Sequence, residues 1–115
     1  MQDLHHTYES LHKEHHAWRK DLITVRNDLN MLSEKITKAK TSKDVGDLES
    51  KLKWHHEEVS KRLENLTQAD MLMNENKDKN HVVSQKLFAI NSKMRQDLIK
   101  FDTEFEKFKD VCNSL

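Results

Sequence analysis

Apolar side chains recur at alternating steps of three and four residues along the first forty positions. The series is Leu4, Tyr8, Leu11, His15, Trp18, Leu22, Val25, Leu29, Leu32, Ile36 and Ala39. These are the a and d positions of a heptad repeat, which is typical of a helix that packs lengthwise against other helices. We therefore predict a first helix over about residues 3–40, a rod of about 55 Å at about 1.5 Å per residue.

The heptad phase breaks at residues 41–47, where the chain also has its only glycine. Thr41 or Ser42 can cap the N-terminus of a following helix, and Asp44 stands where a capping box usually has Glu. Both signals predict a turn here, followed by a second helix over about residues 43–73.

Two further heptad series follow this turn. The second is Val45, Leu48, Leu52, His55, Val59, Arg62 with Leu63, Leu66, Ala69 and Met73, and the third is Val83, Leu87, Ile90, Met94, Leu98, Phe101, Phe105, Phe108, Cys112 and Leu115. Between them, the polar residues 74–80 predict a second turn in which Asp78 or Asn80 caps a third helix over about residues 80–113. The heptad phase continues across this stretch, so the alternative is one helix of about 70 residues.

The predicted fold is all-α: an elongated, antiparallel, up-down-up three-helix bundle with coiled-coil-like heptad packing, formed by residues 1–115 as a single domain. The alternative, with one long second helix, is a helical hairpin that dimerises into a longer coiled coil. The chain has no proline, and charged and hydrophobic residues each make up 35% of it. Such a composition favours a narrow core with wide solvated faces.

Charge and composition argue against several functional classes. The chain has 20 basic and 20 acidic residues and no strongly basic segment, so no nucleic-acid partner is expected. No apolar run approaches the roughly 18 residues of a membrane span, and the start lacks the pattern of a secretory signal. Cys112 is the only cysteine, so neither an internal disulfide nor a cysteine zinc site is expected. We expect a cytoplasmic protein that does not bind membranes.

Eight histidines in 115 residues are the one unusual feature of the composition. Four residues at steps of three and four share one face of the predicted first helix, and we call them the histidine stripe: His5, Glu9, His12 and His16. Two imidazoles one turn apart can chelate Zn²⁺, Ni²⁺ or Cu²⁺. The sequence lacks the ligands on several helices that diiron bundles and hemerythrin-like proteins use. Three interpretations stay open: an evolved metal site on the stripe, adventitious Zn²⁺ or Ni²⁺ binding, and histidines that bind no metal.

His15 and His55 differ from the other histidines because both fall on core positions of their heptads. We predict that both are buried and neutral, with pKa values below the ordinary value of about 6.5, since burial disfavours the charged form. Most carboxylates are expected to titrate at lower pH than these histidines.

The segment LHKEHHAW, residues 11–18, resembles the Leu-His-x-Glu-His-x-x-Trp start of a group of small uncharacterised bacterial helical proteins. This resemblance covers mainly the first helix and implies an all-helical fold without implying an activity. The core position of Trp18, three long helices and the chain length also resemble a single spectrin-type repeat. The third helix departs from that repeat, with Met94 near the place of its second tryptophan, so this resemblance concerns architecture alone.

No motif in the chain indicates a reaction, since a phosphate-binding glycine loop and a nucleophile elbow are both absent from the sequence. We therefore expect a non-enzymatic helical interaction or structural module without a cofactor. It is expected to bind another protein or a second copy of itself, and to be a monomer or a homodimer. The alternative is a metal-binding helical bundle that uses the histidine stripe.

Overall fold

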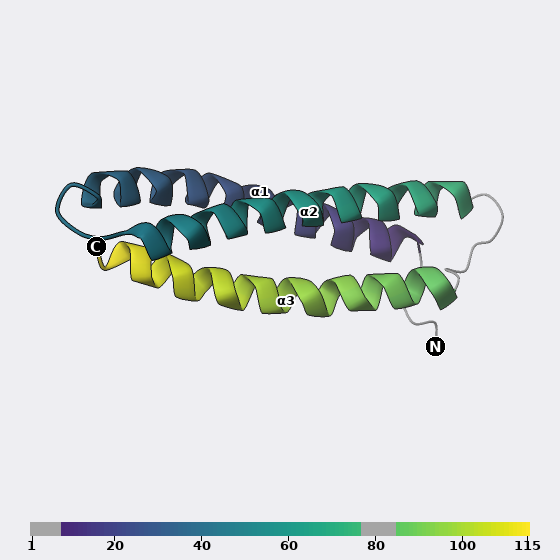
Figure 1. The fold of residues 1–115 in the computed structure, drawn as a ribbon. Helices are drawn as coiled ribbons and strands as arrows, with labels where there is room; N and C mark the ends of the chain where they lie inside the picture. The colour runs from purple at the N-terminus through teal and green to yellow at the C-terminus, as the bar shows by residue number, and fades with distance from the viewer. Residues whose placement is uncertain (1–7, 77–84) are drawn as a thin grey trace.

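The computed structural model describes residues 8–76 and 85–115, which form three α-helices. α1 spans Tyr8–Ala39, α2 spans Gly46–Asn76 and α3 spans Gln85–Asn113 (Figure 1). α1 and α3 run in the same direction, α2 runs opposite to both, and each helix packs against the other two. The predicted all-α three-helix bundle is confirmed. The alternative of one continuous helix is wrong, because α3 turns back to pack along both α1 and α2.

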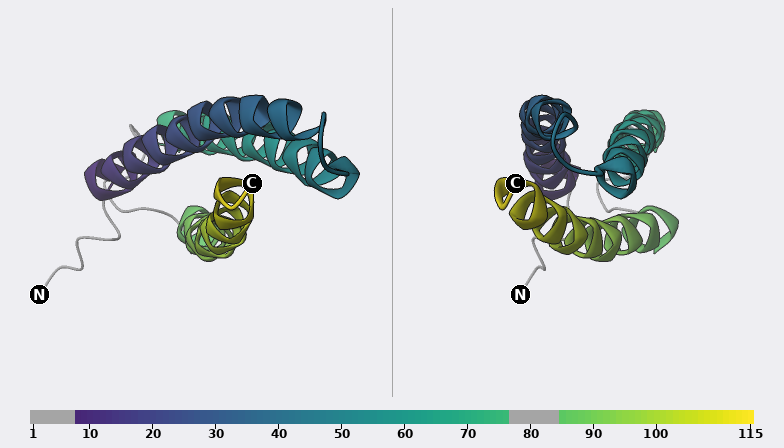
Figure 2. Two further views of the ribbon diagram at one scale, coloured as in Figure 1. Left: turned by 90° about the vertical axis from the view of Figure 1, so that its left-hand side faces the viewer. Right: turned by 60° about the vertical axis from the view of Figure 1, so that its left-hand side comes forward.

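The bundle is elongated, with extents of 60 × 26 × 17 Å. The helices do not cross at equal angles: α1 and α2 lie side by side and curve together, whereas α3 crosses this pair obliquely (Figure 2). Buried residues occur along the whole of α3, from Leu87 to Cys112, so α3 packs on the pair over its full length.

The heptad positions form the core, as the sequence predicts. The buried apolar residues are Leu11, Leu22, Val25, Leu29, Leu32, Ile36, Val45, Val59, Leu66, Ala69, Met73, Leu87, Leu98, Phe101, Phe105, Phe108 and Cys112. Burying each large side chain contributes about 1.5–3 kcal/mol, so this row is the main source of stability. Leu115 was assigned to the core but is 38% exposed, because it lies past the end of α3. Leu4 and Val83 lie outside the described residues.

Phe101, Phe105 and Phe108 of α3 pack in the same apolar cluster as Leu29, Leu32 and Ile36 of α1. Cys112 continues this row and is fully buried. Burial raises the pKa of its thiol, which disfavours the reactive thiolate.

The first turn lies between Ala39 and Gly46, as predicted, but its capping differs from the prediction. The Thr41 hydroxyl donates to the Lys38 carbonyl (3.0 Å), and the Ser42 hydroxyl donates to the Ala39 carbonyl (3.4 Å). Both side chains therefore satisfy the C-terminal end of α1. The predicted capping box is wrong, because the side chain that binds an amide in the first turn of α2 is that of Asp44 and neither Thr41 nor Ser42.

The N-terminus of α2 is capped by Asp44 instead. Its Oδ1 accepts a hydrogen bond from the Gly46 amide at 3.1 Å. This satisfies one of the amide groups that the first turn of a helix leaves free, and the negative charge is favourable beside the positive end of the helix dipole.

α2 continues to Asn76, beyond its predicted end at residue 73. The predicted turn residues Asp78 and Asn80, and the predicted start of the third helix at residue 80, lie outside the described residues.

We predict that Asp44→Ala lowers the free energy of unfolding by about 1 kcal/mol, because it removes the side-chain cap of α2. Thr41→Ala is the matched control and should cost less, since its hydroxyl only supplements backbone bonds at the end of α1. Urea melts followed by circular dichroism measure both, and equal losses would contradict the assignment of the cap to Asp44.

Candidate functional site

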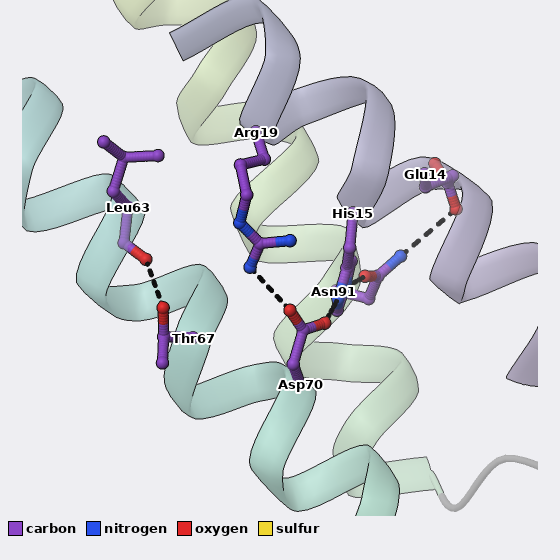
Figure 3. A network of polar contacts seen from close by, with 7 residues as sticks. All are labelled: Glu14, His15, Arg19, Leu63, Thr67, Asp70 and Asn91. Atoms are coloured by element: carbon purple, nitrogen blue, oxygen red, sulfur yellow. Dashed lines mark hydrogen bonds and ion pairs between the residues drawn. The ribbon is translucent and has the colours of Figure 1, made fainter. Parts of the chain in front are cut away.

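A polar cluster crosses the core of the bundle and joins all three helices (Figure 3). His15 of α1 stands at its centre and is only 1% exposed. Its Nδ1 lies 2.7 Å from Oδ1 of Asp70 on α2, and its Nε2 lies 2.6 Å from Oδ1 of Asn91 on α3. We call His15, Asp70 and Asn91 the polar layer. Sequence reasoning placed His15 in the core and did not find its two partners.

The two partners of His15 in the polar layer, Asp70 and Asn91, are themselves held in place by charged side chains. Arg19 of α1 forms an ion pair with Asp70. On the other side, the Asn91 amide donates to Oε1 of Glu14 at 3.3 Å, which orients the Asn91 oxygen toward His15. Arg95 binds both oxygens of Glu14, with distances of 2.9 and 2.7 Å. A bidentate guanidinium contact fixes direction as well as distance.

Both ring nitrogens of His15 thus face oxygen acceptors. The imidazolium form carries hydrogen on both nitrogens and satisfies both acceptors at once, whereas a neutral ring donates to one only. The predicted burial of His15 is confirmed, and the ring has a polar partner on each side.

The pKa of Asp70 is held below its ordinary value of 3.8. Burial raises this pKa, and the hydrogen bonds and charges of His15 and Arg19 together outweigh that effect. Asp70 therefore remains a carboxylate at neutral pH and supplies the negative charge of the polar layer.

A His–Asp pair can act as a general base only where a substrate reaches the ring. Here Nδ1 contacts Asp70, Nε2 contacts Asn91, and the ring is buried. The arrangement instead couples three helices at one level of the bundle. Its chemistry is that of a buried polar contact that specifies how helices align.

His55 of α2 occupies a second buried site of a different kind. Its ring stacks on Phe108 with centroids 4.7 Å apart and also contacts Phe105 at 6.0 Å. Nδ1 lies 2.7 Å from the Lys51 carbonyl, and Nε2 is buried without a hydrogen-bond partner among the described residues. Burial lowers the pKa of His55 below 6.5, so the prediction of a buried ring with a depressed pKa is confirmed for this histidine.

Trp54 lies next to this site and is 46% exposed. Its ring contacts His55 edge-on with centroids 4.8 Å apart and lies 6.3 Å from Phe101. It covers the flank of the aromatic cluster on the side of α2 that faces α3.

The histidine stripe is described only in part, because His5 lies outside the described residues. His12 and His16 are exposed on successive turns of α1, and Glu9 forms an ion pair with Lys13 at 3.4 Å. Across residues 8–76 and 85–115, no three His, Cys, Asp or Glu side chains converge to hold a metal ion.

Within the same residues, none of the three helices has an apolar stretch long enough to cross a membrane. Comparisons with protein-family models, with curated proteins and with solved structures gave no match.

We predict that Asp70→Asn lowers the free energy of unfolding by about 1–3 kcal/mol at neutral pH, because the polar layer loses its charge and leaves buried donors poorly paired. The pKa of Asp70 is lowered on folding, so its contribution is present above about pH 3.8 and is lost as pH falls through the folded pKa. Urea melts at several pH values should show the two proteins converging in acid. Glu57→Gln, at an exposed position in the middle of α2, is the control and should change little. A loss for Asp70→Asn that is the same at all pH values would contradict this role.

The alternative of a metal site on the histidine stripe can be tested at the exposed pair His12 and His16 of α1. If the stripe is a site, Zn²⁺ should bind the untagged full chain at one equivalent, and His12→Ala with His16→Ala should abolish that binding. Calorimetric titration measures it, with His56→Ala as a control histidine on α2. Weak binding that is reduced similarly by both variants would identify adventitious binding.

Proposed function

We propose that the chain is a non-enzymatic helical interaction module that associates with a second copy of itself through a groove between α2 and α3. The observation that carries the proposal is this groove, a hollow of about 480 Å³ between the C-terminal half of α2 and the N-terminal half of α3. The polar layer supports the non-enzymatic part of the proposal indirectly. Its buried histidine is bonded to Asp70 and Asn91, and these contacts join the helices.

The groove has an apolar lining and a charged rim. Ala69 and Leu72 of α2 and Ile90 and Met94 of α3 contribute apolar surface. Concave apolar surface of this kind suits the side of a helix, whose own apolar residues would be removed from water on docking.

The rim of the groove carries unpaired positive charge on one helix and negative charge close by on the other. Lys86 and Lys93 line it from α3, and neither forms an ion pair with another described residue. On α2 the amide of Gln68 lines the groove and donates to the carboxylate of Glu64 at 3.4 Å. In a two-fold dimer, a lysine of one copy would meet Glu64 of the other copy, and the same contact would occur twice.

The size and net charge of the chain are compatible with this dimer. The groove spans only Asn65 to Leu72 of α2 and Lys86 to Asp97 of α3, so a stable dimer must also cover the rest of this face. The whole face, two helices wide and about 30 residues long, covers on the order of 900 Å², taking about 1.5 Å per residue and about 10 Å per helix. A standard stable interface needs about 800 Å² from each partner. The net charge is zero, so two copies do not repel each other as a whole.

Sedimentation equilibrium of the purified chain over a wide concentration range tests the proposal. We expect a monomer–dimer equilibrium, with Lys93→Glu and Glu64→Lys each weakening it about tenfold, which is about 1.4 kcal/mol. The double variant should recover most of the wild-type affinity, because it restores the opposite charges. Lys20→Glu on α1 is the matched control and should leave the equilibrium unchanged.

A single-chain mass at every concentration would contradict self-association, as would equal effects of Lys93→Glu and Lys20→Glu. If the purified chain stays monomeric and a photo-crosslinker at position 93 captures a different protein in cells, the groove belongs to that partner instead.

A further inference from the structure

A row of charged contacts joins α1 to α3 at constant spacing. Glu14 pairs with Arg95 at 2.7 Å, and Asp28 pairs with Lys109 at 3.4 Å. In both pairs the α3 residue is 81 positions later in the chain, as expected for parallel helices whose flanking charges repeat every heptad. The same spacing brings together Asp21 and Asp102, midway between these pairs. Two contacts of the row are therefore complementary, and the central contact joins two carboxyl groups.

The atoms of this central contact lack other partners. Oδ2 of Asp21 and Oδ1 of Asp102 are buried, and neither has a hydrogen-bond donor among the described residues. Two carboxylates cannot hydrogen-bond to each other, but a single proton between them turns one into a donor. The contact is therefore repulsive when both groups are ionised and attractive when they share one proton.

The surroundings favour the shared proton. The pKa of Asp102 is raised from 3.8 to about 7, first by burial, then by its hydrogen bond to Asp21 and the charge of Asp21, and further by Glu106 of α3. Arg62 of α2 acts in the opposite direction and is the smallest of these effects. Asp102 is thus an exception among the carboxylates, most of which are expected to titrate below the histidines.

We propose that the Asp21–Asp102 contact is a proton-sensitive catch, which holds α3 against α1 when the pair carries a proton and loosens that contact when the proton is lost. The inference does not depend on how the groove between α2 and α3 is used, since it concerns the opposite side of α3.

The direction of the effect follows from the two pKa values of Asp102. The folded value, about 7, lies above the unfolded value of 3.8. The folded chain therefore binds more protons between these values, and the contribution of the catch is fully present below about pH 3.8 and lost as pH rises through about 7. His55 has a lowered pKa and acts in the opposite direction below pH 6.5, so the catch must be measured as a difference between matched variants.

The test is hydrogen exchange of the full-length chain, followed by mass spectrometry and corrected for the intrinsic rate at each pH. For wild type, we expect the opening constant of the middle of α3 to rise up to about tenfold per pH unit as pH increases from about 5 to about 7. Asp102→Asn keeps the size of the side chain and cannot lose the proton, so this slope should disappear. Asp21→Lys replaces the repulsive contact with an ion pair, so α3 should stay protected at alkaline pH as well.

Asp110→Asn, an exposed aspartate of α3, is the control and should keep the wild-type slope. Nuclear magnetic resonance of the side-chain carboxyl carbons gives a direct second readout, in which the Asp21–Asp102 pair should show a titration near pH 7. The proposal is overturned if both carboxyls titrate below about pH 5. It is also overturned if Asp102→Asn keeps the slope, or if the slope depends on added divalent cations and vanishes in EDTA.

Discussion

The contacts that His15 makes with Asp70 and Asn91 define the level at which the three helices align. Apolar heptads alone permit helices to slide past one another by a full repeat, since one leucine layer resembles the next. A buried imidazole between a carboxylate and an amide has no equivalent one heptad away. Sliding any helix would leave buried donors and acceptors unpaired, at a cost of about 1–3 kcal/mol for each group. The spacing of 81 residues between α1 and α3, on which the outer ion pairs depend, follows from this alignment.

Heptad periodicity was sufficient to predict the three helices, most of the core and the burial of both core histidines. It did not predict the two polar partners of His15, Asp70 and Asn91. Asn91 directly follows Ile90, where the third series has two successive steps of four, from Ile90 to Met94 and from Met94 to Leu98. The pattern gives no reason to place Asn91 in the core in preference to its apolar neighbour. Asp70 lies beside Ala69, so its role depends on which face of α2 approaches α1. Such information is absent from the period of one helix and arises only when two helices are placed together.

Two other features illustrate the same limit. Thr41 and Ser42 have the chemistry of caps for a following helix, but α2 begins only at Gly46, where Asp44 is the nearer residue. Their hydroxyls bond instead to carbonyls of the preceding helix. The oblique crossing of α3 also has no signal in the sequence, because a heptad series specifies which residues meet and leaves the crossing angle to the fit of the side chains. The groove between α2 and α3 follows from that angle, so it could not be anticipated from the apolar positions that line it.

The polar layer also divides the apolar interior into two unequal parts. The larger contains Phe101, Phe105 and Phe108 of α3 and most of the buried residues of α1. The smaller contains Leu11, Met73 and Leu87 with their half-buried neighbours, one of which is Phe88. Cooperative unfolding depends on continuous packing, and a polar boundary interrupts it. Among residues 8–76 and 85–115, the smaller part has few buried side chains to oppose the entropy gained when the ends of three helices separate. This end of the bundle should therefore open and close as a local unit while the larger part remains folded, so that the molecule behaves as two units of different stability within one domain.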